Sequence, residues 1–118
     1  MPLQFGLLTG KCNPWTRFGS DDHRSYRLTP QMLTRAHEAL QEVWLLADDL
    51  KMTKTALSLS YCLSFPQVST VIPGIKTAEQ VDQNTAGIEP IGDVTLQRLR
   101  LTYSTNLAQL VELMEKQG

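Results

Sequence analysis

The pattern of apolar and polar positions predicts a chain built mainly from helices. Thr29-Pro30 is a favourable helix start, with Thr as N-cap and Pro at the first helical position. Apolar residues then recur at three- and four-residue spacing, which predicts one amphipathic helix over about residues 30–50. Its apolar face comprises Leu33, Ala36, Leu40, Val43, Trp44, Ala47 and Leu50.

A second helix is predicted to follow Thr53, which can serve as its N-cap, and to stop before Pro66. Its sequence, KTALSLSYCLSF, is apolar on most sides, so we expect the helix to be well buried. Cys62 belongs to this run and is expected to act as a small buried hydrophobe.

The next elements are a strand and a short helix. Residues 69–72, STVI, are short and largely β-branched, which indicates a strand buried on both faces, and Pro73-Gly74 ends it. Thr77 and Gln80 have the spacing of a capping box, which predicts a helix over about 77–86. A single strand cannot form a sheet, so its partners are expected to lie outside this chain.

Asp93 can cap a last helix of about six turns. Its apolar stripe, at near-heptad spacing, consists of Leu96, Leu99, Tyr103, Leu107, Leu110 and Met114. This stripe fits either ordinary packing against the domain or a seam for a partner. Residues 1–28 carry turn-forming glycines and charged residues and are expected to be irregular.

Composition narrows the possible functions. The 118 residues suit one domain, and the hydrophobic content of 42% is ordinary for a globular protein. A net charge of −1 argues against a general nucleic-acid binder. No apolar run suggests a membrane span or a secretory signal, and Cys12 and Cys62 form no zinc or disulfide pattern. We therefore expect a cytoplasmic protein without a metal site.

Two long motifs resemble the C-terminal third of the aldo-keto reductases. They are PLQFGLLTGK at 2–11 and VSTVIPGIKTAEQVDQN at 68–84, and DDHR at 21–24 and TALSLSYCLSFPQVST at 55–70 also resemble the family. The resemblance implies an α/β origin, the C-terminal portion of a (β/α)₈ TIM barrel. It implies one incomplete domain over 1–118, mostly helical with one or two short parallel strands. Residues 1–28 would then be the loop region after strand seven, and 29–118 the helices with strand eight.

The resemblance also implies an NADP(H) site. Barrel enzymes commonly bind phosphate with the loops after strands seven and eight and a nearby helix N-terminus. Gly74, Lys76, Gln80, Gln83 and Asn84 would surround the adenosine phosphate and adenine, and Pro2, Leu3, Gln4 and Phe5 would line the pyrophosphate side. Lys11 and Arg24 would pair with phosphate oxygens. The local sequence alone also fits a capped helix with a solvated lysine at Lys76.

The family's catalytic Asp, Tyr, Lys and His would all lie upstream of the matched segment, so the resemblance implies no catalytic residue here. It therefore implies a reductase segment that is inactive alone. Two alternatives remain at this point: a non-enzymatic, self-associating fragment and an unrelated small helical regulator. The partners to consider are a second copy of the chain and a missing upstream half. Because Gly74, Ile75 and Gln80 replace residues common in the family, the preference for NADPH over NADH rests mainly on Lys76.

Overall fold

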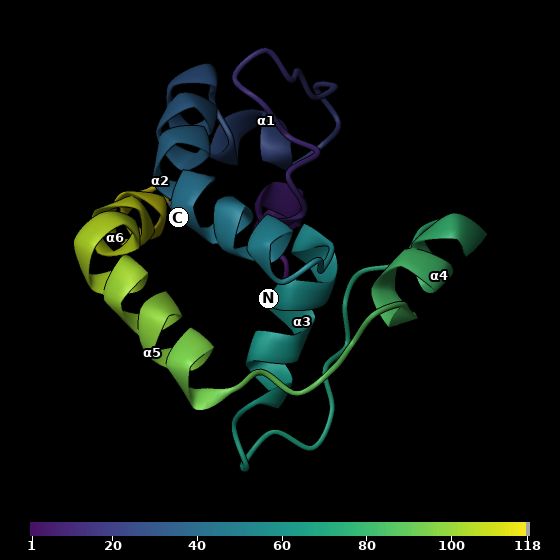
Figure 1. The fold of residues 1–118 in the computed structure, drawn as a ribbon. Helices are drawn as coiled ribbons and strands as arrows, with labels where there is room; N and C mark the ends of the chain where they lie inside the picture. The colour runs from purple at the N-terminus through teal and green to yellow at the C-terminus, as the bar shows by residue number, and fades with distance from the viewer. Residues whose placement is uncertain (118) are drawn as a thin grey trace.

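The structure is a computed structural model that describes residues 1–117 as helices joined by loops (Figure 1). In chain order these are η1 (Gln4–Thr9), α1 (Arg24–Arg27), α2 (Pro30–Asp49), α3 (Lys54–Leu63), α4 (Ala78–Thr85), α5 (Asp93–Thr102), η2 (Tyr103–Leu107) and α6 (Ala108–Lys116). The expectation that residues 1–28 are wholly irregular was wrong, because η1 and α1 lie within them. None of the helices in the described part of the chain is long and apolar enough to cross a membrane.

The longest helix, α2, confirms the first prediction closely. Thr29 caps it by accepting a hydrogen bond from the Met32 N–H at 3.3 Å. Leu33, Ala36 and Leu40 are buried as expected, whereas Leu50 lies beyond the helix end and is 37% exposed. The buried face forms the main core with residues of η1 and α6 and with the residue that follows α1. This core comprises Leu7, Leu28, Met32, Leu33, Ala36, Leu40, Trp44 and Leu110.

Helix α3 also begins where the sequence predicts, after Thr53, whose hydroxyl accepts from the Ala56 N–H at 3.0 Å. Residues 56–60 are buried, and the two serines among them are satisfied. Ser58 donates to the Lys54 carbonyl at 2.8 Å, and Ser60 accepts from the Glu89 N–H at 3.1 Å. The second bond fixes the segment after α4 against α3. Cys62 is only half-buried, so its expected burial was overstated.

A contact between Gly10 and Lys54 connects the first segment of the chain to α2 and α3. Gly10 has φ +71°, and a Cβ there would lie 2.6 Å from the Lys54 Cδ. The Lys54 ammonium lies 4.5 Å from the centre of the Trp44 ring. Glycine is therefore required both by the backbone conformation and by the close approach of the lysine.

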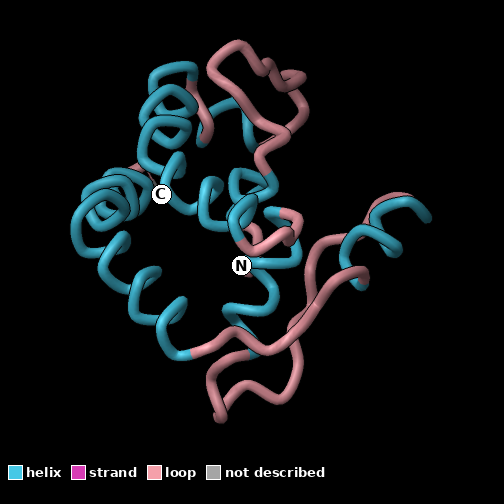
Figure 2. The backbone as a smooth tube through the Cα atoms, in the orientation of Figure 1, coloured by secondary structure: helices cyan, strands magenta, loops and turns pink. Residues whose placement is uncertain are grey.

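The predicted strand at 69–72 is wrong in this structure, which has helices and loops but no strand within residues 1–117 (Figure 2). The physical reason is the lack of a second strand to pair with it, which the sequence had already indicated. A strand is stabilised by a hydrogen-bonded ladder with a neighbour, and residues 1–117 provide no second strand.

The last predicted helix is divided into three parts. Gly92 is the N-cap of α5, and Asp93 is its first helical residue, not the cap. The π-helical turn η2 separates α5 from α6. Thr102 is buried and Tyr103 is 49% exposed, in contrast to the predicted stripe. Leu99 and Leu110 are buried as expected.

Candidate functional site

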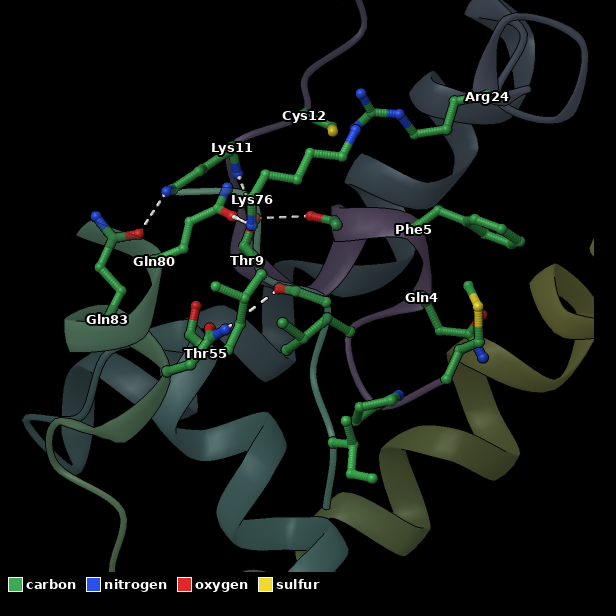
Figure 3. A pocket seen from close by; sticks show the side chains of 18 of the residues that line it. Gln4, Phe5, Thr9, Lys11, Cys12, Arg24, Thr55, Lys76, Gln80 and Gln83 are labelled. Carbon is green, nitrogen blue, oxygen red and sulfur yellow. Dashed lines mark hydrogen bonds between the residues drawn. The ribbon is translucent and has the colours of Figure 1, made fainter. Parts of the chain in front are cut away.

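A pocket of about 780 Å³ lies between the first segment of the chain and the region around α4 (Figure 3). All eleven residues predicted as cofactor ligands line it: Pro2, Leu3, Gln4, Phe5, Lys11, Arg24, Gly74, Lys76, Gln80, Gln83 and Asn84. They come from residues 2–24 and 74–84, which lie 50 positions apart in the sequence, so only the folded chain brings them together. Whether they bind a cofactor stays a prediction.

Helix α4 forms one wall of the pocket and, among the other helices, contacts α3. Thr77 caps it by accepting from the Gln80 N–H at 3.2 Å. The Gln80 side chain in turn accepts from the Lys76 N–H at 2.6 Å, one residue before the position expected of a capping box. The Asn84 amide donates to the Gly74 carbonyl at 3.3 Å. Gln80 and Asn84 thus hold the loop that carries Lys76.

The opposite wall begins with a strained turn. Gln4 and Phe5 have φ values of +46° and +58°, in the left-handed region that few residues other than glycine adopt. Gly6 follows with φ +94°. The Phe5 ring meets the His23 ring edge-on at 5.4 Å. Such strain is often found at binding sites, and here it lies in the predicted pyrophosphate wall.

Two lysines enter the pocket from different segments and have different surroundings. The Lys11 ammonium donates to Gln83 Oε1 at 2.7 Å, which links the first segment to α4 (Figure 3). Gln83 also donates to the Glu79 carboxylate, so a negative charge lies near the start of α4. Among residues 1–117, the Lys76 ammonium makes no ion pair or side-chain hydrogen bond. Lys76 therefore has its full charge available for an anion.

The third cation, Arg24, already has a partner. Its guanidinium donates to both carboxylate oxygens of Asp22: Nη2 lies 2.6 Å from Oδ2, and Nε lies 3.0 Å from Oδ1 and from Oδ2. This pairing holds the pKa of the Asp22 carboxyl well below its usual range. The Arg24 guanidinium also lies 4.5 Å from the centre of the Phe18 ring. A phosphate would have to share Arg24 with Asp22, which weakens the role that the sequence suggested.

Sequence reasoning did not assign several residues that line the same pocket: Met1, Gly6, Thr9, Cys12, His23, Thr55, Ile72 and Ile75. Gly6 and Thr9 belong to a quoted motif and could have been included by position. Thr55, by contrast, is brought in by α3, which only the tertiary structure reveals. Burial raises the pKa of the Cys12 thiol, and the nearby Arg24 opposes this effect. No group of three His, Cys, Asp or Glu side chains suited to a metal ion occurs among the described residues.

Comparison with known proteins assigns the chain to a family. The sequence profile of the Aldo/keto reductase family matches residues 1–98. The match includes both walls of the pocket. This chain belongs to the aldo/keto reductase family.

Curated relatives include two proteins named as potassium channel subunits and one reductase. The chain is 30% identical over 105 residues to a putative voltage-gated potassium channel subunit beta of Schizosaccharomyces pombe, covering 84% of this chain and 30% of that protein. It is 30% identical over 97 residues to a probable voltage-gated potassium channel subunit beta of Arabidopsis thaliana, covering 76% of this chain and 29% of that protein. It is 31% identical over 118 residues to an L-glyceraldehyde 3-phosphate reductase of Escherichia coli O157:H7, covering 92% of this chain and 30% of that protein.

The chain therefore spans about 30% of the length of these relatives. No solved structure matches this chain. The family implies a (β/α)₈ barrel, while the residues described here are mostly helical.

Proposed function

We propose that this chain carries the part of an aldo/keto reductase that binds the adenosine end of NADP(H). The observation that supports this most strongly is the pocket that collects all eleven residues suggested by the family motifs. The family generally uses NADP(H), and the matched region contains every one of these residues. The named reductase among the relatives is consistent with carbonyl reduction by a complete protein of this type.

The residues present fit a phosphorylated nucleotide. The Lys76 ammonium is exposed and has no carboxylate partner in residues 1–117, so it can neutralise a phosphate. It lies at the N-terminus of α4, where helix N–H groups favour an anion. Gln83 and Asn84 line the same wall and offer amide groups suited to the edge of a nucleobase. The negative charge of the Glu79 carboxylate, in the first turn of α4, would repel an anion. The proposal therefore depends on the positive charge of Lys76 to offset this repulsion.

Lys11 is expected to exchange partners when a nucleotide binds. Its ammonium is held by a neutral amide oxygen of Gln83, and a phosphate is a stronger acceptor for a cation. When bound, NADPH supplies the hydride in this family. The role of this chain is confined to holding the nucleotide, because the family's Asp, Tyr, Lys and His are expected to come from sequence upstream of the matched motifs.

The direct test is a titration of the purified 118-residue chain with NADPH, followed by ligand fluorescence, with NADH titrated in parallel. We expect saturable NADPH binding that is weakened about tenfold by Lys76→Ala, since a charge pair near the surface contributes about 1 kcal/mol or slightly more. NADH binding should change little, because NADH lacks the extra phosphate. Lys116→Ala is the matched control, as Lys116 pairs with Glu112 on α6.

Two results would contradict the proposal. Absence of binding at millimolar NADPH would mean that the motif is inherited without a working site in this chain. Equal weakening of NADPH and NADH by Lys76→Ala would place the lysine away from the phosphate that distinguishes them. A parallel assay of NADPH oxidation with a panel of aldehydes should give no turnover by the chain alone.

A further inference from the structure

His23 lines the pocket but has no role in the function proposed above. It lies directly before α1 in the chain, and its side chain is 58% exposed. Its ring meets the Phe5 ring edge-on at 5.4 Å, so the histidine stands beside the strained turn of the first segment. Figure 3 shows Phe5 and Arg24 at one side of the pocket and Gln83 at the other. His23 therefore belongs to the side where the pyrophosphate is expected.

The side chains that line the pocket carry positive charge and no negative charge. Among the described residues that line it, Lys11, Arg24 and Lys76 are cations, and none is Asp or Glu. Histidine is the side chain whose charge ordinarily changes between about pH 5 and 8. Cys12 also lines the pocket, but burial raises the pKa of its thiol, so the thiol keeps its proton in this range. Protonation of His23 would thus add a further positive charge to the site near neutral pH.

The carboxylate that faces His23 is already engaged. Nδ1 of His23 lies 3.9 Å from Oδ1 of Asp22, which is too far for a hydrogen bond. Asp22 accepts instead from the backbone N–H and the guanidinium of Arg24. The same partner holds the pKa of the Asp22 carboxyl well below its usual range, so its charge is constant near neutral pH. Because Arg24 neutralises Asp22, an imidazolium at position 23 would keep its charge for an anion in the pocket.

Two further charged groups lie near His23 in space or in the chain. The Arg27 guanidinium lies 5.5 Å from the centre of the Phe5 ring, whose edge His23 meets. Asp21 is exposed and precedes Asp22 in the chain. One of these groups is positive and the other negative, so together they add little net charge at His23. Proton uptake by His23 itself is therefore the main change in charge on this side of the pocket.

We propose that His23, in its protonated form, binds the pyrophosphate of the nucleotide in this pocket, so that binding strengthens as pH falls from 8 to 6. This inference rests on the proposed function, which supplies the pyrophosphate. An anion binds an imidazolium more tightly than a neutral imidazole. By linkage, the bound anion must in turn raise the fraction of His23 that holds a proton. The proton supplies the charge that Arg24 has already given to Asp22.

The first test compares the parent chain with His23→Gln by isothermal titration calorimetry at pH 6, 7 and 8. NADPH and inorganic pyrophosphate are the two ligands, in buffers free of phosphate. The ratio of parent affinity to variant affinity should rise about fivefold from pH 8 to pH 6, which corresponds to about one charge pair near the surface. Any titration of the ligands or of the Met1 amino group is common to both proteins, so the ratio removes it.

A fixed charge at the same position provides the matched comparison. His23→Lys should bind both ligands more tightly than His23→Gln by a factor that is the same at pH 6 and pH 8, because lysine keeps its proton throughout this range. Circular dichroism establishes that both variants keep the helical content of the parent chain. A purely structural role of His23 predicts no such rescue by lysine.

Nuclear magnetic resonance reports on the proton directly. The chain has two histidines, so the ring signal of each can be followed against pH with and without saturating pyrophosphate. The midpoint of the His23 titration should move upward by at least about 0.7 of a pH unit, the equivalent of a fivefold preference for the protonated form. His37 lies on α2 and is absent from the pocket lining, so its midpoint should not move.

The outcomes separate this inference from the proposed function. An affinity ratio that is equal at pH 6 and pH 8, with NADPH still bound, would overturn the role of His23 and leave the nucleotide site standing. Pyrophosphate binding that depends on His23 and pH, without NADPH binding, would support His23 as an anion ligand and contradict the proposed function. Binding of neither ligand, with no movement of the His23 midpoint, would overturn both.

Discussion

Replacing Gly10 by alanine tests how the chain positions the loop that carries Lys11. Two separable effects are expected. Alanine at φ +71° costs about 1 kcal/mol in backbone conformation. The new Cβ would lie 2.6 Å from the Lys54 Cδ, so the lysine must move off the Trp44 ring, with loss of about 1 kcal/mol of cation–π attraction. Gly10→Ala should therefore destabilise the chain by about 2 kcal/mol.

The assay is urea unfolding followed by far-ultraviolet circular dichroism, with a double-mutant cycle. In a Lys54→Ala background the alanine at position 10 meets no lysine, so its effect should fall to about 1 kcal/mol. Gly6→Ala is a matched control, because Gly6 has φ +94° but a Cβ there would meet open space. It should cost only the backbone contribution, about 1 kcal/mol.

The reasoning is refuted by either of two results. One is a Gly10→Ala variant no less stable than Gly6→Ala. The other is an unchanged effect of Gly10→Ala in the Lys54→Ala background. In both cases the close approach of Lys54 would have no energetic consequence.

Three further changes test other parts of the structure. Leu33→Ala removes a core side chain that is 1% exposed and should lower the free energy of unfolding by about 2–5 kcal/mol in urea. Thr77→Ala removes the cap of α4 and should cost about 1 kcal/mol of local stability, seen as faster amide exchange of Gln80, with weaker NADPH binding as a consequence. Asp22→Asn tests the Arg24 pair: because the folded-state pKa of Asp22 is lowered, the pair stabilises the fold above the ordinary carboxyl pKa of about 4, and this stabilisation disappears as pH falls through the lowered value. The melting-temperature difference between the parent and Asp22→Asn should therefore be constant near neutral pH and shrink in acid; a difference independent of pH would contradict the pairing.

Local signals in the sequence predicted the helices well. The caps at Thr29, Thr53 and Thr77 act where expected, because an N-cap depends only on residues within one turn of it. The buried face of α2 likewise follows from the 3.6-residue period of its apolar side chains.

Predictions that depended on distant or competing partners fared worse. The strand at 69–72 required neighbouring strands, and its β-branched residues could not supply them. The stripe of the last helix required an unbroken α-helical period, which the π turn at 103–107 interrupts. That Arg24 binds phosphate stays a prediction, and its competitor Asp22, two residues away, pairs with the guanidinium in the folded chain.

By itself, therefore, the sequence determined where α2, α3 and α4 begin, which faces of α2 and α3 are apolar, and which motifs resemble the family. The tertiary structure decided that Pro2–Phe5 and Lys11 share a pocket with Lys76 and α4. It also decided that the Lys11 ammonium is held by Gln83, whereas the Lys76 ammonium has no side-chain partner among residues 1–117. The difference has a physical cause. Caps and periodicity are set by residues within a turn or two, whereas a pocket and its charges depend on packing between segments far apart in the chain.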